Sequence, residues 1–173
     1  MISAEEISVL VDRIAAEVQA TYQDSPRRLI MVVILKGSMP FAAELLKRLT
    51  LPVELEFMKV SSYGAGTKSS GEIKISLDLV RDDLQDIDLL LIEDIVDSGR
   101  TLSRLTDLLR NRNAHSVRTC TLLDKPSRRE VDFTPDFCGT VVPDEFVVGF
   151  GLDYNEKYRN LPFIGVLKPE IYS

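Results

Sequence analysis

The sequence predicts an α/β fold, in which a doubly wound and mostly parallel central sheet is flanked by helices and carries a small hood. Two apolar runs, Leu29–Leu35 and Leu89–Ile92, are nearly continuous, as in parallel strands that are buried on both faces. Each run is followed by a short polar segment that contains glycine, and then by apolar residues at helical spacing. Strands that alternate with helices in this way build parallel sheets.

Length and composition predict one domain with a small appended lobe. We expect this domain to span residues 1–173, with the hood mainly from about residue 126 to 173. The chain has 173 residues, of which 45% are hydrophobic, so it can bury a substantial core. The net charge of −6 argues against a general nucleic-acid surface. The longest apolar run has seven residues, which is too short to span a membrane, and the N-terminus lacks a secretory pattern. Cys120 and Cys138 follow no metal spacing, so we expect a reducing cytoplasm.

The first elements are a helix, a strand and a second helix. Ser3 and Glu6 have the spacing of a capping box, and the apolar residues that follow predict an amphipathic helix to about Tyr22. The strand Leu29–Leu35 leads into Lys36-Gly37-Ser38, and the next helix starts at Met39 with a proline suited to its first turn. The stretch Lys36-Gly37-Ser38 could therefore be either the plain start of a helix or a loop that binds a ligand.

Alternating apolar residues predict two further strands, Val53–Val60 and Ile73–Leu79. Between them lies Ser61–Gly71, which is rich in Gly, Ser and Thr. It is either a floppy hairpin loop or a lid that closes over a reacting substrate. Val117–Leu123 predicts another strand, and short strands and turns follow in the last forty residues.

The chain is organised around the stretch from Leu89 to Leu102. Three carboxylates, Glu93, Asp94 and Asp97, follow the buried strand, and a helix begins at or just after the turn Asp97–Thr101. Free amide groups and the helix dipole make such a turn an anion site, although Asp97 or Ser98 could also be an ordinary N-cap.

The carboxylates beside this turn indicate more than a phosphate. Like charges repel, so Glu93 and Asp94 should accept hydrogen bonds from hydroxyl groups attached to the phosphate or reach a metal ion. A ribose 5-phosphate satisfies both halves of such a site.

The stretch resembles the signature of the phosphoribosyltransferases: a hydrophobic strand, two acids, two apolar residues, then Asp-(Ser/Thr)-Gly-x-Thr. The resemblance implies the family fold and the donor 5-phosphoribosyl-1-diphosphate. Glu93 and Asp94 would hold the ribose hydroxyls, and Asp97 would also be the general base for the purine N7 proton. The 5-phosphate would be held by the loop amides of Asp97, Ser98, Gly99, Arg100 and Thr101. The side chain of Arg100 receives no role beyond surface charge.

Other segments resemble further parts of the family site. Lys36-Gly37 matches the pyrophosphate loop, whose Leu35–Lys36 peptide would then be cis. Ser62-Tyr63 matches the mobile catalytic loop. In the pattern Leu-x-Lys-x-x-x-Arg, Lys125 would recognise the purine 6-oxo group and Arg129 would help hold pyrophosphate, although a Lys and an Arg after a strand are commonly just solvated.

The segment 142–162 closely resembles the purine-binding part of the hypoxanthine branch. By that resemblance Phe146 stacks on the base, the backbone of Val147 accepts from N1–H, Asp153 binds Mg²⁺ and Arg159 lies near pyrophosphate. Mg²⁺ would supply the countercharge that an acidic protein needs for a polyanionic substrate, with Glu93 and Asp94 as further candidate ligands.

The expected reaction moves a ribosyl phosphate to N9 of hypoxanthine or guanine and yields IMP or GMP plus pyrophosphate. The family usually forms dimers or tetramers, so we expect a homodimer or homotetramer, without nucleic-acid or membrane partners. Two alternatives stay open: a xanthine–guanine preference, and a regulatory protein that keeps the phosphoribosyl site as a sensor.

Overall fold

A computed structural model describes residues 1–62, 73–81 and 83–171 of the chain. Its main sheet has six strands in the order β3-β2-β1-β4-β5-β6, parallel except for the β2–β3 pair. The bounds are β1 Arg28–Ile34, β2 Val53–Ser62, β3 Ile73–Leu77, β4 Ile87–Val96, β5 Ser116–Asp124 and β6 Phe137–Val141. The predicted mostly parallel α/β sheet is confirmed.

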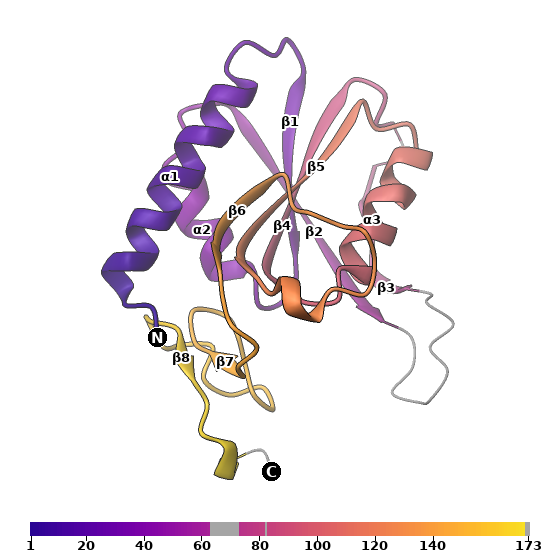
Figure 1. The fold of residues 1–173 in the computed structure, drawn as a ribbon. Coiled ribbons are helices and arrows are strands. Elements are labelled where there is room, and N and C mark those ends of the chain that lie inside the picture. The colour runs from indigo at the N-terminus through magenta and orange to yellow at the C-terminus, as the bar shows by residue number, and fades with distance from the viewer. Residues whose placement is uncertain (63–72, 82, 172–173) are drawn as a thin grey trace.

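Helices cover both faces of this sheet. Helices α1 (Ala4–Tyr22) and α2 (Met39–Leu46) lie on one side, and α3 (Arg100–Asn111) lies on the other (Figure 1). Strand β1 shows why, because its residues are buried alternately in two cores: Leu29, Met31 and Val33 pack toward α1 and α2, and the intervening residues pack toward α3. The doubly wound arrangement therefore follows from a strand that is apolar on both faces.

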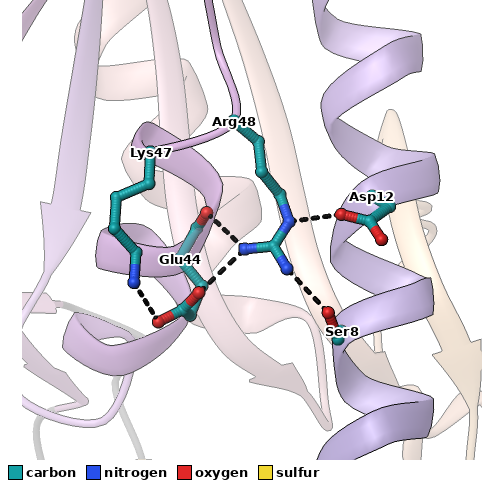
Figure 2. Close-up of polar contacts among 5 residues, drawn as sticks. All are labelled: Ser8, Asp12, Glu44, Lys47 and Arg48. Carbon is teal, nitrogen blue, oxygen red and sulfur yellow. Dashed lines mark hydrogen bonds and ion pairs between the residues drawn. The ribbon is translucent and has the colours of Figure 1, made fainter.

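The first helix begins and ends where the sequence predicts. The Glu6 amide donates to Ser3 Oγ, and the Ser3 amide donates to the Glu6 carboxylate, which completes the capping box. Arg48, just after α2, joins the two helices of this face: its guanidinium binds the carboxylates of Asp12 on α1 and Glu44 on α2 (Figure 2).

Several regions differ from the sequence prediction. Strand β2 continues to Ser62, so Ser61 and Ser62 belong to the strand and not to the predicted loop, and β3 ends at Leu77 and not at Leu79. Strand β4 continues through Glu93 and Asp94 to Val96, so both carboxylates belong to the strand rather than to the loop after it. Strand β6 was not predicted and joins the main sheet beside β5. The short strands β7 (Val147–Val148) and β8 (Gly165–Val166) form a separate antiparallel pair.

The separate pair lies beyond one end of the main sheet. Figure 1 shows β7 and β8 at the same end as the 3₁₀ turn Pro126–Arg128, which directly follows β5. That end therefore carries the carboxyl ends of the parallel strands, where ligands of open α/β sheets bind. No helix in the described ranges is both long and apolar enough to cross a membrane.

Candidate active site

The turn between β4 and α3 is built as the anion-loop interpretation requires. Gly99 occupies the N-cap position with a φ of 79°, a left-handed conformation that favours glycine. Neither Asp97 nor Ser98 is the N-cap, so the ordinary capping alternative does not account for them. The first amides of α3 point out of the helix end, as in a phosphate-binding turn.

Glu93 and Asp94 are a pair of poorly solvated acids at the end of β4. Burial raises the pKa of Glu93 well above its ordinary value, and the neighbouring Asp94 carboxyl raises it further. Burial also raises the pKa of Asp94, although a hydrogen bond from Glu93, the Ile95 amide and the charge of Arg159 act in the opposite direction. The surroundings of the strand end therefore do not compensate two negative charges, and the protonated form of Glu93 is favoured without a ligand.

Gly37 brings the loop after β1 against Asp94. A Cβ atom at Gly37 would lie 1.7 Å from Asp94 Oδ2, so only glycine leaves room for that carboxylate. On its other side, the carbonyl oxygen of Gly37 would lie 1.9 Å from a Cβ atom at Gly151. The 142–171 segment therefore sits directly on the Lys36-Gly37 loop. The Leu35–Lys36 peptide bond is cis, as the resemblance implies.

Two predicted pyrophosphate residues, Lys36 and Arg159, lie close together because both bind Glu156. Glu156 Oε2 is 3.0 Å from Lys36 Nζ and 3.3 Å from Arg159 Nη2. Arg159 also binds Asp153 Oδ1 at 2.8 Å and donates from Nη1 to the carbonyl oxygen of Gly151 at 2.8 Å. The predicted magnesium ligand Asp153 is thus joined to the cationic cluster.

The predicted purine residues line one cavity of about 470 Å³, which contains Lys125, Phe146, Val147 and Asp153. Lys125 is buried, and its Nζ lies 3.7 Å from Asp97 Oδ1. Phe146 also lines the cavity and is 38% exposed as a residue, so its side chain is accessible to a ligand. The same cavity is also lined by Asp94, Ile95, Asp97, Arg128, Asp144, Glu145 and Leu152.

A second cavity, of about 390 Å³, holds the phosphate loop. It is lined by Glu93, Ser98, Gly99 and Thr101, and Ser61 at the end of β2 contributes to its wall. Both cavities share the residues Asp94, Ile95 and Asp97. The predicted base site and the predicted sugar-phosphate site are therefore adjacent, with Asp97 at their boundary.

Some predicted residues are not gathered with the others. Arg129 donates to the carbonyl oxygen of Asp97 and binds the Asp124 carboxylate, and neither contact involves Lys36 or Arg159. The backbone of Ser62 ends β2, whereas Tyr63 lies outside the described residues, so the lid prediction stays a prediction. The side chain of Arg100 forms an ion pair with Glu130 at 2.5 Å.

Three contacts were not anticipated from the sequence. Tyr154 meets the Phe146 ring edge-on, with 5.7 Å between ring centroids and an 88° interplanar angle. Glu156 bridges the two cations, and Asp124 pairs with Arg129. In the sequence, Tyr154 and Glu156 lie close to Asp153, and Asp124 directly precedes Lys125. These neighbours were the available signals, but spacing alone does not show which side chains contact each other.

The acidic residues fit a Mg²⁺ ion that is shared with a substrate. Among the described residues, no group of three acidic, histidine or cysteine side chains could by itself hold a metal ion. Mg²⁺ is commonly bound by one or two carboxylates together with substrate phosphates and water, so a complete protein cage is not needed. A cation that arrived with the substrate would favour the ionised forms of Glu93 and Asp94, whose pKa values are raised by burial in the ligand-free protein.

Comparisons with known proteins agree with this geometry. Residues 3–155 match the model of the phosphoribosyl transferase domain. The chain is 52% identical over 173 residues to the hypoxanthine-guanine phosphoribosyltransferase of Bacillus subtilis and covers 94% of that protein. It is 53% identical to the bifunctional protein TilS/HprT of Listeria innocua, of whose length it spans about a quarter (26%).

A solved structure shows the same likeness in three dimensions. The crystal structure of a hypoxanthine phosphoribosyltransferase from Staphylococcus aureus superimposes with a TM-score of 0.94 at 45% sequence identity. The superposition covers 100% of this chain and 92% of that one.

Proposed function

This chain belongs to the phosphoribosyltransferase family, and from that premise we propose that it transfers the 5-phosphoribosyl group of 5-phosphoribosyl-1-diphosphate to N9 of hypoxanthine or guanine. The products are IMP or GMP and pyrophosphate, as expected of an enzyme of purine salvage. One observation carries the proposal: a cavity with a buried lysine and an exposed aromatic face adjoins a cavity with a phosphate loop, and Asp97 belongs to both.

The sugar-phosphate end is assigned to β4 and the turn after it. The amides of residues 97–101 hold the 5-phosphate, because the amides of a helix N-terminus favour an anion. Glu93 and Asp94 accept hydrogen bonds from the ribose hydroxyls. Their carboxylates also face a reacting carbon that becomes positively charged as pyrophosphate leaves, and that charge is stabilised by nearby anions.

The pyrophosphate end is assigned to Lys36, Gly37 and Arg159. The cation pair lies beside Asp153, which supports a pyrophosphate bound together with Mg²⁺. Asp153, with Glu93 and Asp94 as further candidates, would hold that ion, and the ion would neutralise charge on the leaving group. Arg129 is not assigned to this set, because one end of its guanidinium is bonded to Asp97 and the other end to Asp124.

The purine end is assigned to Lys125, Phe146 and Val147. Lys125 donates to O6, the backbone oxygen of Val147 accepts from N1–H, and the base stacks on Phe146. Asp97, beside Lys125, takes the N7 proton. O6 and N7 lie on the same edge of the purine, so the neighbouring side chains of Lys125 and Asp97 are suited to contact both atoms at once.

We further propose that residues 1–173 act as one domain and that copies of it associate as a homodimer or homotetramer. Leu55, Phe57 and Leu77 support association, because each is more than 40% exposed on the outer strands β2 and β3. Contiguous exposed apolar residues commonly mark protein interfaces. Size-exclusion chromatography with light scattering measures the oligomeric state directly.

An assay with single bases tests the function. The purified protein is incubated with Mg²⁺, the diphosphate donor and one of hypoxanthine, guanine, xanthine or adenine, and nucleotide formation is measured. We expect IMP and GMP. Xanthosine monophosphate formed as fast as GMP would support the xanthine–guanine alternative. Donor binding without any nucleotide would support the regulatory alternative.

A further inference from the structure

Arg129 is held between the phosphate loop and the end of β5. One terminal nitrogen, Nη1, donates to the backbone carbonyl oxygen of Asp97, and the other, Nη2, binds the Asp124 carboxylate. Both side chains are poorly exposed, at 14% for Arg129 and 10% for Asp124. A charge-assisted pair with little access to water is stronger than a surface ion pair. The contact therefore restrains the phosphate loop more strongly than a surface ion pair would.

The neighbouring backbone reinforces the same contact. A Cβ atom at Gly99 would lie 2.9 Å from Arg129 Cδ, so the turn packs directly on the arginine stem. The Glu130 amide donates to the Ser98 carbonyl oxygen at 3.0 Å, and the Lys125 amide donates to the Val96 carbonyl oxygen at 2.9 Å. The segment after β5 thus contacts the phosphate loop at each residue from Val96 to Gly99.

These contacts make Arg129 poorly suited to bind pyrophosphate. The planar guanidinium already uses one end for a carbonyl oxygen and the other for a carboxylate, and a phosphate oxygen would have to displace one of them. Lys36 and Arg159 are instead assembled around Glu156, without Arg129.

We propose, building on the function assigned above, that Arg129 and Asp124 are positioning residues that hold the Asp97 backbone in place. Held there, the Asp97 carboxylate stays within 3.7 Å of the Lys125 ammonium, and the loop amides stay aimed at the 5-phosphate. Lysine cannot replace the arginine, because one ammonium cannot reproduce two parallel donors in a rigid fork.

The test compares Arg129→Lys and Asp124→Asn with the control Arg13→Lys. Arg13 on α1 also binds a carboxylate and a carbonyl oxygen, those of Glu17 at 2.8 Å and Cys138 at 2.9 Å, and neither partner belongs to the phosphate loop. Calorimetry measures the binding of IMP alone and of magnesium pyrophosphate alone. IMP requires the phosphate loop but carries no pyrophosphate, so the two ligands separate the two roles.

For a positioning role, both variants should weaken IMP binding about tenfold and lower kcat by roughly 10- to 100-fold, since small misplacements of catalytic groups have effects of this size. Pyrophosphate binding should change less than about twofold, and Arg13→Lys should behave as wild type. Weakened pyrophosphate binding with unchanged IMP binding would make Arg129 a direct pyrophosphate ligand and overturn the proposal. Equal weakening of both ligands, or of neither, would overturn it as well.

Hydrogen exchange of the ligand-free protein tests the restraint independently of any activity. Amides of residues 97–102 should exchange faster in Arg129→Lys and Asp124→Asn than in wild type or Arg13→Lys. Unchanged exchange would refute the restraint. If wild type neither binds IMP nor forms nucleotide, the proposed function fails, while faster exchange in the two variants would still support the positioning role.

Discussion

The ammonium nitrogen of Lys125 lies 3.7 Å from the carboxylate oxygen Oδ1 of Asp97. The lysine side chain is 9% exposed and the aspartate side chain 49%, so a buried cation stands beside an accessible anion at the border of two cavities. A purine that enters the larger cavity would meet a donor for O6 and an acceptor for the N7 proton in one place. This arrangement underlies the first and the last of the predictions that follow.

Asp97→Asn should remove proton acceptance while keeping the shape of the phosphate loop. General-base catalysis contributes roughly 10²–10⁴-fold, so kcat should fall by that factor while the KM for the diphosphate donor changes little. Steady-state kinetics with hypoxanthine measures both. Asp86→Asn, in an exposed turn before β4, is the matched control. A kcat close to that of wild type would remove Asp97 from the role of general base.

Glu93→Gln should stabilise the protein at neutral pH when neither Mg²⁺ nor substrate is present. Burial raises the pKa of Glu93 well above the ordinary 4.5. At pH values between 4.5 and this raised pKa, the folded chain therefore holds a proton that the unfolded chain releases. Stability therefore falls as pH rises through this window. Glutamine is neutral throughout, and we expect a higher Tm for the variant above the window and a flatter dependence of Tm on pH.

The control for this experiment has the opposite sign. A hydrogen bond from Arg28 lowers the pKa of Glu54, so Glu54→Gln removes a favourable charge and should not raise the Tm at neutral pH. The prediction is tested by thermal unfolding of wild type, Glu93→Gln and Glu54→Gln between pH 5 and 8 in EDTA. Parallel Tm curves for Glu93→Gln and wild type would show that the folded protein does not retain the proton.

The sheet and its helices could be predicted because their signals are local. The capping box at Ser3 and the apolar run of β1 each lie within one element, and the alternate burial of β1 follows from an uninterrupted apolar sequence. Strand β6 lacks such a signal: it has only five residues, and Gly139 lies against the Leu122 carbonyl oxygen of β5. Its place depends on parallel pairing with β5 across the loop that joins the two strands, and no pattern within β6 itself indicates that pairing.

The candidate site divides in the same way. The phosphate loop could be predicted because strand, acids, glycine and helix follow one another in the sequence. The roles of Arg129 and Glu156 could not, because their partners are set by how loops fold back. Glu156 has a positive φ of 64°, a conformation that its residue type does not favour, and this places its carboxylate between two cations.

Gly37→Ala should damage donor binding through Asp94. The added Cβ would lie 1.7 Å from Asp94 Oδ2, so the carboxylate must move away from its place beside the loop. Loss of a hydrogen bond to a buried polar group costs about 1–3 kcal/mol, so the KM for the diphosphate donor should rise accordingly. Gly165→Ala, whose nearest contact is an ordinary 3.4 Å, is the control. An unchanged donor KM would dissociate Asp94 from ribose binding.

Glu156→Gln should tighten the binding of pyrophosphate. Glu156 occupies Lys36 and Arg159, which are the cations proposed for the leaving group, and therefore competes with it. Exposed ion pairs contribute about 0.2–1 kcal/mol, so the inhibition constant of pyrophosphate should fall by about two- to fivefold at most. Glu44→Gln is matched, because Glu44 also binds two cations, Lys47 and Arg48, far from the loop. Weaker inhibition would mean that Glu156 holds the cations in place.

Base choice should depend on Lys125 and on the backbone of Val147. A 6-oxopurine offers an acceptor at O6 and a donor at N1, whereas adenine reverses both. Lys125 has only donors, and the Val147 carbonyl has only lone pairs, so adenine would leave both groups without a partner. Sites that hydrogen-bond their substrate reject such analogues by as much as ~10⁴, and we expect activity on hypoxanthine and guanine with almost none on adenine.

Lys125→Gln should reduce this preference, because an amide can turn to present either a donor or an acceptor. The measurement is kcat/KM for hypoxanthine, guanine and adenine with both proteins. The ratio of hypoxanthine to adenine should fall in the variant mainly because hypoxanthine loses its charged donor. Lys47→Gln, an exposed lysine after α2, controls for the loss of a positive charge. If the wild-type protein used adenine as well as hypoxanthine, the assignment of the purine cavity would fail, and the sugar-phosphate cavity would need another acceptor base.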